Sequence, residues 1–227
     1  MFRFYGETEL YVWELTNWHS SVQYGYYRDL LANLRRIAPP ETHPRLLDYG
    51  AGIGTAARIM AKHGYRVTIA DVPGKSLDFA KFRLQREGLR IETLPLTLTT
   101  PPSFGTFDLI VCFDVLEHVP RVEDVVSALN RSLRTGGYAA IVATFYDPVG
   151  QHPHHLAENI RKFGDNRVWG MFLEGHGLKV VHPHIYCKTN PIESMARRFR
   201  YRLWERTGYM LRSPVVKLNA LERQRDE

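Results

Sequence analysis

Three glycines and two aspartates in the first third of the chain are spaced for ligand binding. Gly50, Gly52 and Gly54 directly follow an apolar run, and Asp48 stands two residues before the first of them. Glycines at such a turn let the chain bend tightly and let a ligand approach the backbone closely. Asp71 follows 21 residues after Gly50, at the end of the next apolar run. The pattern predicts a nucleoside site on a loop between a strand and a helix.

The spacing differs from that of dinucleotide-binding loops. Their fingerprint places a glycine three residues after its second one, where this chain has Thr55. A carboxylate at Asp48 would repel a pyrophosphate but would suit an ammonium or a sulfonium group. Asp71 can accept charge-assisted hydrogen bonds from both ribose hydroxyls of an adenosine, at roughly 1.5–3 kcal/mol each. A positively charged adenosine ligand is therefore expected, and another adenosine ligand, or none, is the alternative.

Strand and helix patterns alternate around these residues. Apolar periodicity first predicts a helix over 27–37. The predicted strands are 45–49, 65–70, 89–94, 108–113, 138–144 and 178–185, and the predicted helices are 55–63, 76–87, 122–133, 155–163, 168–176 and 193–212. Gly64, Gly88 and the pair Gly136-Gly137 are expected to close the first three of these helices. The order predicts an α/β fold with a doubly wound, mostly parallel sheet and helices on both faces.

With these motifs in view, the chain resembles the class I SAM-dependent methyltransferases over about residues 44–145. The glycine loop resembles that family's first motif, and Asp71 resembles its ribose-binding acid. The run FDLIVCFDVLEHVP at 107–120 is similar to its fourth-strand motif, and LRTGGY at 133–138 to the turn before its fifth strand. The resemblance implies a Rossmann-like fold with a seven-stranded sheet, S-adenosylmethionine (SAM) as the cofactor, and methyl transfer. These motifs do not specify the substrate.

The resemblance also implies roles for individual residues of the cofactor site. The glycine loop would pass beside the methionine part of SAM, with Asp48 orienting it toward the amino group, and Asp71 would hold the ribose. Adenine would lie by residues 95–98, where many members carry an acid and this chain carries none. A backbone group at Thr97 or Leu98 would serve instead. The implied cofactor-binding set is Asp48, Gly50, Gly52, Gly54, Asp71, Thr97 and Asp114.

The loop after the fourth predicted strand is the expected place of the chemistry. Asp114 begins this loop, and ligands of open α/β sheets bind at such strand ends. Asp114 and Glu117 would contact the substrate there, or else cap the next helix. His118 is a candidate general base, because the reference pKa of histidine is about 6.5. Since SAM is already activated, a base is needed only if the acceptor must lose a proton.

A run of histidines follows the fifth predicted strand. His152, His154 and His155 are candidate catalytic residues together with His118. In an extended segment His152 and His154 would point the same way, and with Asp147 they are candidate ligands of a divalent metal. The alternatives are a general base for the reaction and a polar loop with local hydrogen bonds.

Composition narrows the class of protein. The chain has 227 residues, 44% of them apolar, which is enough for a sizeable core. No run of about eighteen apolar residues predicts a membrane-spanning helix, and the first residues do not resemble a secretory signal. Two cysteines, Cys112 and Cys187, provide no disulfide framework. A cytoplasmic location is expected.

Both ends of the chain depart from the central pattern. Residues 1–40 begin with an aromatic-rich stretch, which would form a lid over the site or pack as ordinary core. Residues 191–227 hold nine Lys/Arg and five Asp/Glu, and thus most of the net charge of +6. A helix over 191–212 would suit an anionic membrane surface, a dimer contact or a cover over the core. Residues 41–190 would form the SAM-binding methyltransferase domain.

Together these observations predict a SAM-dependent methyltransferase that acts on a small-molecule acceptor. No Asn-Pro-Pro-Tyr-type motif follows the fourth predicted strand, so a nucleic acid base is not the expected acceptor, although the basic tail leaves RNA open. Two alternatives remain: a metal-assisted enzyme of the same fold that uses SAM for another reaction, and a non-catalytic SAM-binding regulatory subunit. The sequence does not determine the oligomeric state.

Overall fold

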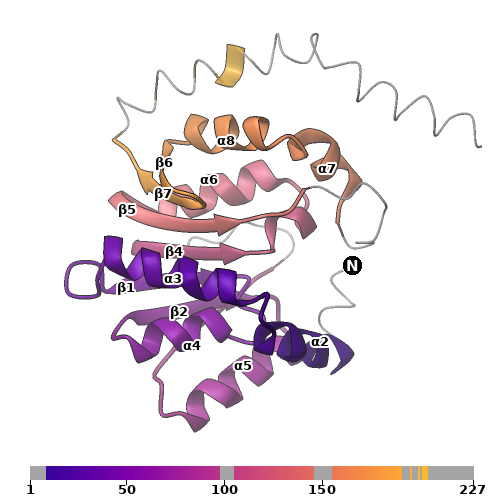
Figure 1. The fold of residues 1–227 in the computed structure, drawn as a ribbon, viewed down its shortest axis with the longest axis vertical. Coiled ribbons are helices and arrows are strands. Elements are labelled where there is room, and N and C mark those ends of the chain that lie inside the picture. Colours follow the sequence, from indigo (N-terminus) through magenta and orange to yellow (C-terminus); the bar gives the residue numbers. More distant parts are fainter. Residues whose placement is uncertain are drawn as a thin grey trace, which may run out of the picture.

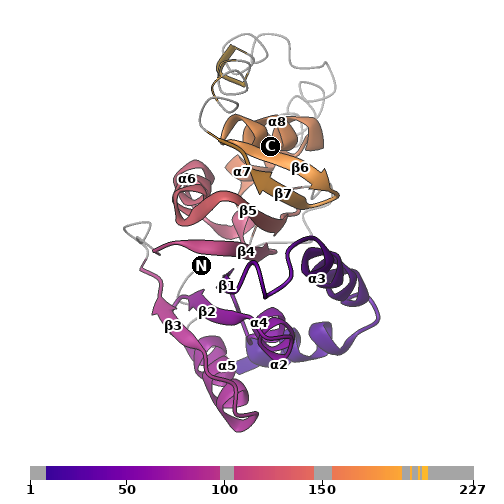
Figure 2. The ribbon, with the colours of Figure 1, turned by 90° about the vertical axis from the view of Figure 1, so that its left-hand side faces the viewer.

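The computed structural model describes residues 9–97, 105–145 and 155–190, together with 195, 199 and 201–203. Its strands are β1 (Arg45–Tyr49), β2 (Arg66–Asp71), β3 (Glu92–Pro95), β4 (Phe107–Phe113), β5 (Leu133–Val142), β6 (Leu178–His182) and β7 (Ile185–Lys188). They form one sheet in the order β3-β2-β1-β4-β5-β7-β6 (Figure 2). Strands β1 to β5 are parallel, and β7 is antiparallel to both β5 and β6. The predicted mostly parallel, seven-stranded sheet is confirmed.

Helices cover both faces of this sheet, as predicted. They are α2 (Glu9–Ser20), α3 (Gly25–Ile37), α4 (Thr55–Lys62), α5 (Lys75–Arg86), the 3-10 turn η1 (Leu116–His118), α6 (Val122–Ser132), α7 (Ala157–Phe163) and α8 (Asn166–Gly175). Successive strand residues point to opposite faces: Leu46 packs with α3, α4 and α5, and Leu47 packs with α6, α7 and α8. In Figure 1, α6 and α8 lie above β4 and β5, and α4 and α5 lie below.

The strand order places a switch point between β1 and β4. From β1 the chain moves outward through β2 to β3, and it then returns to β4 on the other side of β1. Loops after β1 and β4 therefore leave the sheet in opposite directions, which opens a crevice at the carboxyl ends of these strands. The glycine loop and Asp114 both lie there.

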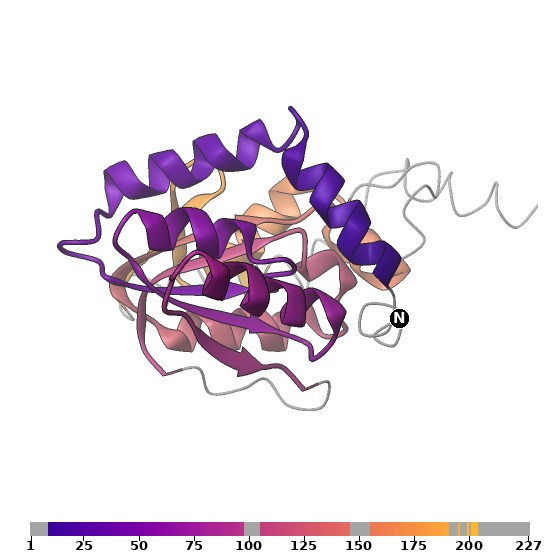
Figure 3. The same ribbon diagram turned by 90° about the horizontal axis from the view of Figure 1, so that it is seen from below.

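The aromatic N-terminal stretch contains a helix that its poor periodicity did not predict. Figure 3 shows α2 and α3 as two indigo helices that meet at an angle. Tyr24 and Tyr27 are buried in the core beside α4, whereas Trp13 on α2 is 65% exposed. Leu15 of α2 comes within 3.3 Å of an ideal Cβ built at Gly52. The stretch thus contributes to the core and also covers the glycine loop.

The predicted helix 122–133 is confirmed to within one residue, but its predicted cap by Gly136-Gly137 is wrong. Helix α6 ends at Ser132, and β5 begins at the next residue. Lys188 explains the early end, because its Nζ donates to the carbonyl oxygens of Asn130 and Leu133, both at 2.5 Å. These helix-end carbonyls therefore need no glycine cap. The glycine pair lies instead in the irregular first part of β5, where the pairing with β4 changes register.

The predicted strand 178–185 is also wrong, because it is two strands. Strands β6 and β7 pair antiparallel and reverse direction at Pro183 and His184. His184 has a φ of 61°, and Pro183 has no N–H to donate to a ladder. Both features favour a turn over a continuous strand.

The C-terminal segment is only partly described. Residues 195, 199 and 201–203 are helical, and the remainder of the predicted helix 193–212 lies outside the described residues. Tyr201 is buried against Phe172 of α8, with ring centroids 5.7 Å apart. None of the described helices is long and apolar enough to cross a bilayer. The boundaries at residues 40 and 191 stay predictions.

Candidate functional site

The glycine loop adopts backbone angles that only glycine takes easily. Gly50, Gly52 and Gly54 have φ values of 72°, 54° and 73°, in the left-handed region where other residues are strained. An ideal Cβ at Gly50 would lie 2.2 Å from Cγ2 of Val115, in the loop after β4. The glycines therefore allow both the turn and a close approach of the two loops that flank the switch point.

Asp71 joins the end of β2 to the glycine loop. Its Oδ2 accepts a hydrogen bond from Gly52 N at 2.5 Å, and its Oδ1 accepts one from Val72 N at 2.7 Å. Burial raises the pKa of Asp71 to about 6, against the lowering effect of these two N–H groups. The side chain is thus held at the crevice beside the bare backbone of the loop, where a ribose could reach it.

Asp48 supports the start of the next helix. The residue is 4% exposed, and its Oδ2 accepts a hydrogen bond from Ala57 N in the first turn of α4 at 2.9 Å. A carboxylate at this end of a helix also interacts favourably with the helix dipole. Burial raises the pKa of Asp48 to about 7, the Ala57 N–H lowers it, and the nearby Asp71 raises it further. Its predicted orientation of the loop toward an amino group stays a prediction.

A residue from the N-terminal part of the chain positions the side chain of Asp114. It follows β4 with a φ of 52°, and its Oδ2 accepts a hydrogen bond from the hydroxyl of Tyr27 on α3 at 2.6 Å. Burial raises the pKa of Asp114, and the Tyr27 hydroxyl lowers it. The rings of Tyr24 and Phe113 lie 5.1 and 5.2 Å from that of Tyr27, so the carboxylate borders an aromatic wall. Sequence reasoning did not assign Tyr27 to the site.

Glu117, His118 and His155 form a cluster beyond Asp114. One potential ligand atom from each residue lies within 4.8 Å of those of the other two. Glu117 is 1% exposed; its Oε1 accepts a hydrogen bond from Thr144 N at 3.1 Å, and its Oε2 has no hydrogen-bond partner among the described residues. Burial, and next the charge of Asp114, raise the pKa of Glu117 to about 8. Two imidazoles and a carboxylate are suitable ligands for a divalent metal.

Asn159 on α7 fixes the position of this cluster. Its Nδ2 donates to the carbonyl oxygen of Val119 at 2.9 Å, and Leu156 N donates to that of Glu117 at 3.0 Å. These bonds attach the segment that carries His155 to η1. Asn159 is 5% exposed. The predictions did not include it, because an asparagine inside a helix gives no local signal of such a role.

The structure brings some predicted site residues together and does not describe others. His118 and His155 lie in one cluster, with ring centroids 4.8 Å apart. The predicted residues Asp147, His152 and His154 lie outside the described residues. Thr97 is exposed just after β3, where Leu96 N donates to the carbonyl oxygen of Asp71 at 2.8 Å. The functional roles of these residues stay predictions.

The carboxyl groups around the crevice suit the charge of SAM. Asp48, Asp71 and Asp114 lie around the glycine loop, which Leu15 and Val115 cover in part. SAM carries a sulfonium and an ammonium group, which would favour ionised carboxylates. Burial raises the pKa values of these three carboxyl groups, and a bound cationic ligand would lower them.

Comparison with protein families and curated proteins gives consistent matches. A family model described as a methyltransferase domain matches residues 22–204. The ubiquinone biosynthesis O-methyltransferase of Bordetella avium (strain 197N) is 31% identical over 111 residues, covering 48% of this chain and 44% of that protein. The protein of the same name from Nitrosomonas europaea is 29% identical over 183 residues, covering 78% and 71%. The chain thus spans less than half the length of the Bordetella relative.

Solved structures agree on the fold. The O-methyltransferase region of StiE, residues 942–1257, has a TM-score of 0.53 at 18% identity, over 80% of this chain and 70% of that one. The [4+2]-cyclase SpnF has a TM-score of 0.51 at 18% identity, over 68% and 57%. These two neighbours are described by different reactions, so their likeness supports the fold alone.

Proposed function

Because this chain belongs to the family of SAM-dependent methyltransferases, we propose that it transfers the methyl group of SAM to a hydroxyl oxygen of a small molecule. The observation that carries the proposal is the hydrogen bond from Gly52 N to Asp71 Oδ2, which unites the two cofactor-binding motifs at the switch point. The oxygen acceptor is supported by the curated relatives, which are described as O-methyltransferases.

When bound, SAM supplies a methyl group that is already activated by its sulfonium. The carbon–sulfur bond breaks while the new carbon–oxygen bond forms, and the hydroxyl proton leaves. The chain must therefore hold the acceptor oxygen in line with the methyl group and receive that proton. We assign the first task to the loop at Asp114 and the second to the cluster of Glu117, His118 and His155.

The aromatic wall favours an aromatic acceptor. Tyr24 and Tyr27 are buried and pack with the half-buried Phe113 beside Asp114, and a phenol or catechol ring would extend this aromatic cluster at Phe113. His118 is the proposed base. Without a metal, Glu117, with a pKa raised to about 8 by burial, carries a proton at neutral pH and is less suited to accept another; a bound cation would displace that proton.

A divalent metal at Glu117, His118 and His155 is a further part of the proposal. The unpartnered Oε2 of Glu117 supports it, because a buried carboxylate oxygen without a donor is costly. The metal would lower the pKa of a bound hydroxyl group. Asp147, His152 and His154, the ligands predicted from the sequence, follow β5 and precede His155, so we propose them as additional ligands.

Metal analysis of the purified protein tests this part. We expect about one equivalent of a divalent metal after loading with Mn²⁺ or Zn²⁺ and dialysis. Glu117→Gln should weaken retention by at least tenfold, and Glu158→Gln, which changes an exposed acid on α7, should leave it unchanged. A wild-type protein that retains no metal would leave His118 acting without one.

Transfer from labelled SAM tests the main proposal. Phenols and catechols should be methylated, while matched aniline and thiophenol analogues should not. His118→Asn should lower kcat by about 10²–10⁴-fold, whereas His63→Asn, at an exposed position after α4, should not. Methylation of nitrogen or sulfur alone would refute the acceptor atom. SAM binding without transfer to any acceptor would support a regulatory subunit instead.

A further inference from the structure

A second cavity, of about 480 Å³, lies between α2, α3, α4 and α5. Four arginines line it: Arg28 and Arg35 from α3, Arg58 from α4 and Arg83 from α5. Its lining includes none of the strand-end aspartates of the crevice and, among the described residues, no acidic side chain at all. The cavity is therefore strongly basic and excludes the carboxylates of the crevice, although Ile53 of the glycine loop also borders it.

Within the described ranges, carboxylates neutralise little of this positive charge. Arg83 donates to two neutral acceptors, Ile53 O at 3.3 Å and Thr55 Oγ1 at 3.2 Å. Arg28 donates to the carbonyl oxygen of His19 at 3.1 Å. Arg58 pairs with Glu87, which also pairs with Lys62. Two cations thus share that one carboxylate.

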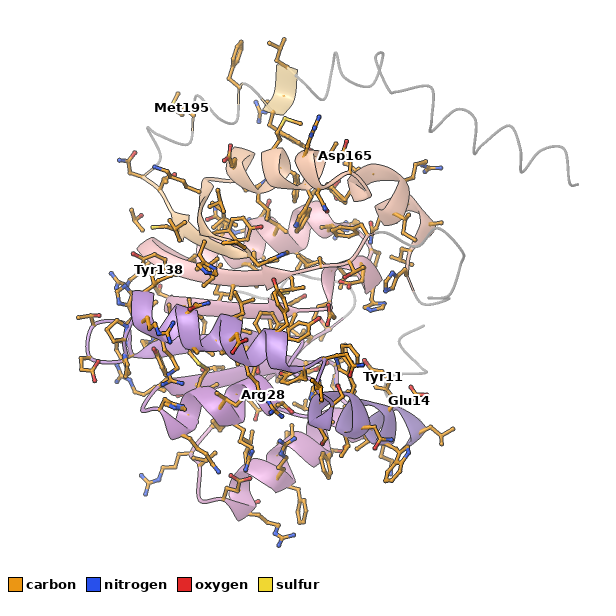
Figure 4. The ribbon with its side chains drawn as sticks, viewed as in Figure 1. Tyr11, Glu14, Arg28, Tyr138, Asp165 and Met195 are labelled. Carbon is orange, nitrogen blue, oxygen red and sulfur yellow. The ribbon has the colours of Figure 1, made fainter. Side chains whose placement is uncertain are left out.

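Arg35 is the clearest case of an uncompensated charge. It is half-buried in the cavity wall, and no ion pair to it occurs within the described part of the chain. Figure 4 shows Arg28 where α3 meets α2, while Glu14, an acid of α2, lies farther along that helix.

Other features of the wall also favour an anion. Thr55 Oγ1 and His19 Nδ1, 2.7 Å apart, add neutral hydrogen-bonding groups to the wall. Burial, and next the charge of Arg83, lower the pKa of His19 to about 4, so this ring is neutral at pH 7. Burial and the neighbouring Arg58 lower the pKa of Arg83 as well, as expected where cations crowd together.

The rest of the wall is apolar, and the volume exceeds that of a small inorganic ion. Ile53, Ile59 and Phe79 line the cavity beside the arginines. Cavities of roughly 300–1,000 Å³ hold organic ligands, with apolar contacts for the body and a few polar groups that fix orientation. Arginine forks bind phosphate oxygens in pairs. The apolar side chains of the wall could therefore contact the body of an organic ligand, and the arginines its phosphate group.

We propose that this cavity is a second ligand site, which binds the phosphate group of an organic phosphate between Arg28, Arg35, Arg58 and Arg83. The same chemistry has two sources, a soluble phosphate ester and the headgroup of an anionic phospholipid. The second source is relevant because α2, which lines the cavity, also carries exposed Leu10 and Trp13, at 70% and 65%. Such side chains can enter a membrane interface.

Calorimetry with inorganic pyrophosphate tests the site without SAM or any acceptor. We expect saturable binding in a chloride buffer of constant ionic strength, which separates a site from general screening. Arg35→Gln should weaken this binding about tenfold. The matched control is Arg36→Gln, which removes the same charge from the next, exposed residue of α3 and should change binding less than twofold. Arg58→Gln provides a second variant from another helix.

Sedimentation with lipid vesicles distinguishes the two sources. Binding to phosphatidylglycerol but not phosphatidylcholine vesicles, lost in Arg35→Gln and in Trp13→Ser, would identify a lipid headgroup. Pyrophosphate binding without vesicle binding would identify a soluble ester. The proposal is overturned if neither probe binds, or if Arg35→Gln and Arg36→Gln weaken binding equally.

Discussion

The two sides of the switch point are built in different ways. On the β1–β2 side, backbone N–H groups close by in the chain hold the carboxylates: Ala57 N binds Asp48, and Gly52 N and Val72 N bind Asp71. On the β4–β5 side, Asp114 depends on Tyr27, 87 residues away.

Glu117 makes the contrast sharper. It depends on Thr144 after β5 for Oε1, and its Oε2 has no described partner. The difference teaches that a cofactor common to a whole family can be held by a local backbone motif. The β4–β5 side, which we propose to hold the acceptor, is assembled from distant side chains.

The largest expected effect tests the buried charge on the cofactor side. Asp48 has a pKa of about 7 in the folded protein and about 3.9 when unfolded. The folded state thus binds the extra proton, and stability falls as pH rises through this interval. Asp48→Asn keeps an acceptor for Ala57 N without the charge. Relative to wild type, its free energy of unfolding should increase by up to about 3 kcal/mol between pH 5 and pH 8.

Urea unfolding of the protein without SAM at both pH values measures this difference. The control is Asp78→Asn, at an exposed position on α5, which should show no such change. An Asp48→Asn protein with the same pH dependence as wild type would show that Asp48 is not the buried titrating group.

The contact between the two sides is the next test. Gly50→Ala places a Cβ against Val115 at a φ of 72°, which should lower the free energy of unfolding by about 3 kcal/mol, from backbone strain and overpacking together. Val115→Ala removes both Cγ atoms and should recover part of that loss. A double-mutant cycle by chemical denaturation measures the coupling, and purely additive losses would mean that the two loops do not touch.

The ribose contact gives a smaller but more specific effect. Asp71→Ala removes two charge-assisted hydrogen bonds and the link to Gly52, so affinity for S-adenosylhomocysteine should fall about 100-fold, or ~2.7 kcal/mol. Asp78→Ala is the matched control on the same side of the sheet. Calorimetry measures the affinity of both folded variants for S-adenosylhomocysteine. An Asp71→Ala protein with wild-type affinity would refute the assigned ribose site.

The smallest expected effect lies on the acceptor side. Tyr27→Phe removes the hydroxyl that donates to Asp114, which should lower kcat/KM about fivefold, or ~1 kcal/mol, with little change in cofactor affinity. Tyr26→Phe alters the neighbouring, exposed ring and should be neutral. A loss of cofactor affinity in Tyr27→Phe would show that the β4–β5 side also binds the cofactor, and would contradict the division between the two sides of the switch point.

The β1–β2 side of the site was predictable from the sequence, and the partners of the carboxylates on the β4–β5 side were not. The glycine turn and the acids Asp48 and Asp71 depend on contacts between residues at most about 20 positions apart in the sequence. Periodicity and motif spacing can therefore predict them. Tyr27, Asn159 and Lys188 act through contacts across 40 to 87 residues. No local pattern marks such residues, because tertiary packing alone determines their partners.

The same reason explains the errors in the predicted elements. The glycine pair at 136–137 resembles a helix end, but Lys188 from the neighbouring strand β7 already binds the carbonyl oxygens of Asn130 in α6 and of Leu133 just after it. The alternating residues of β1 and β4, by contrast, face two apolar layers. Their apolar runs predicted the central strands directly.

The most direct test of the account is titration of the wild-type protein with SAM and with S-adenosylhomocysteine by calorimetry. The account predicts saturable binding of both at one site per chain, because the glycine loop and Asp71 bind the part that the two ligands share. A folded protein that takes up neither ligand would contradict it.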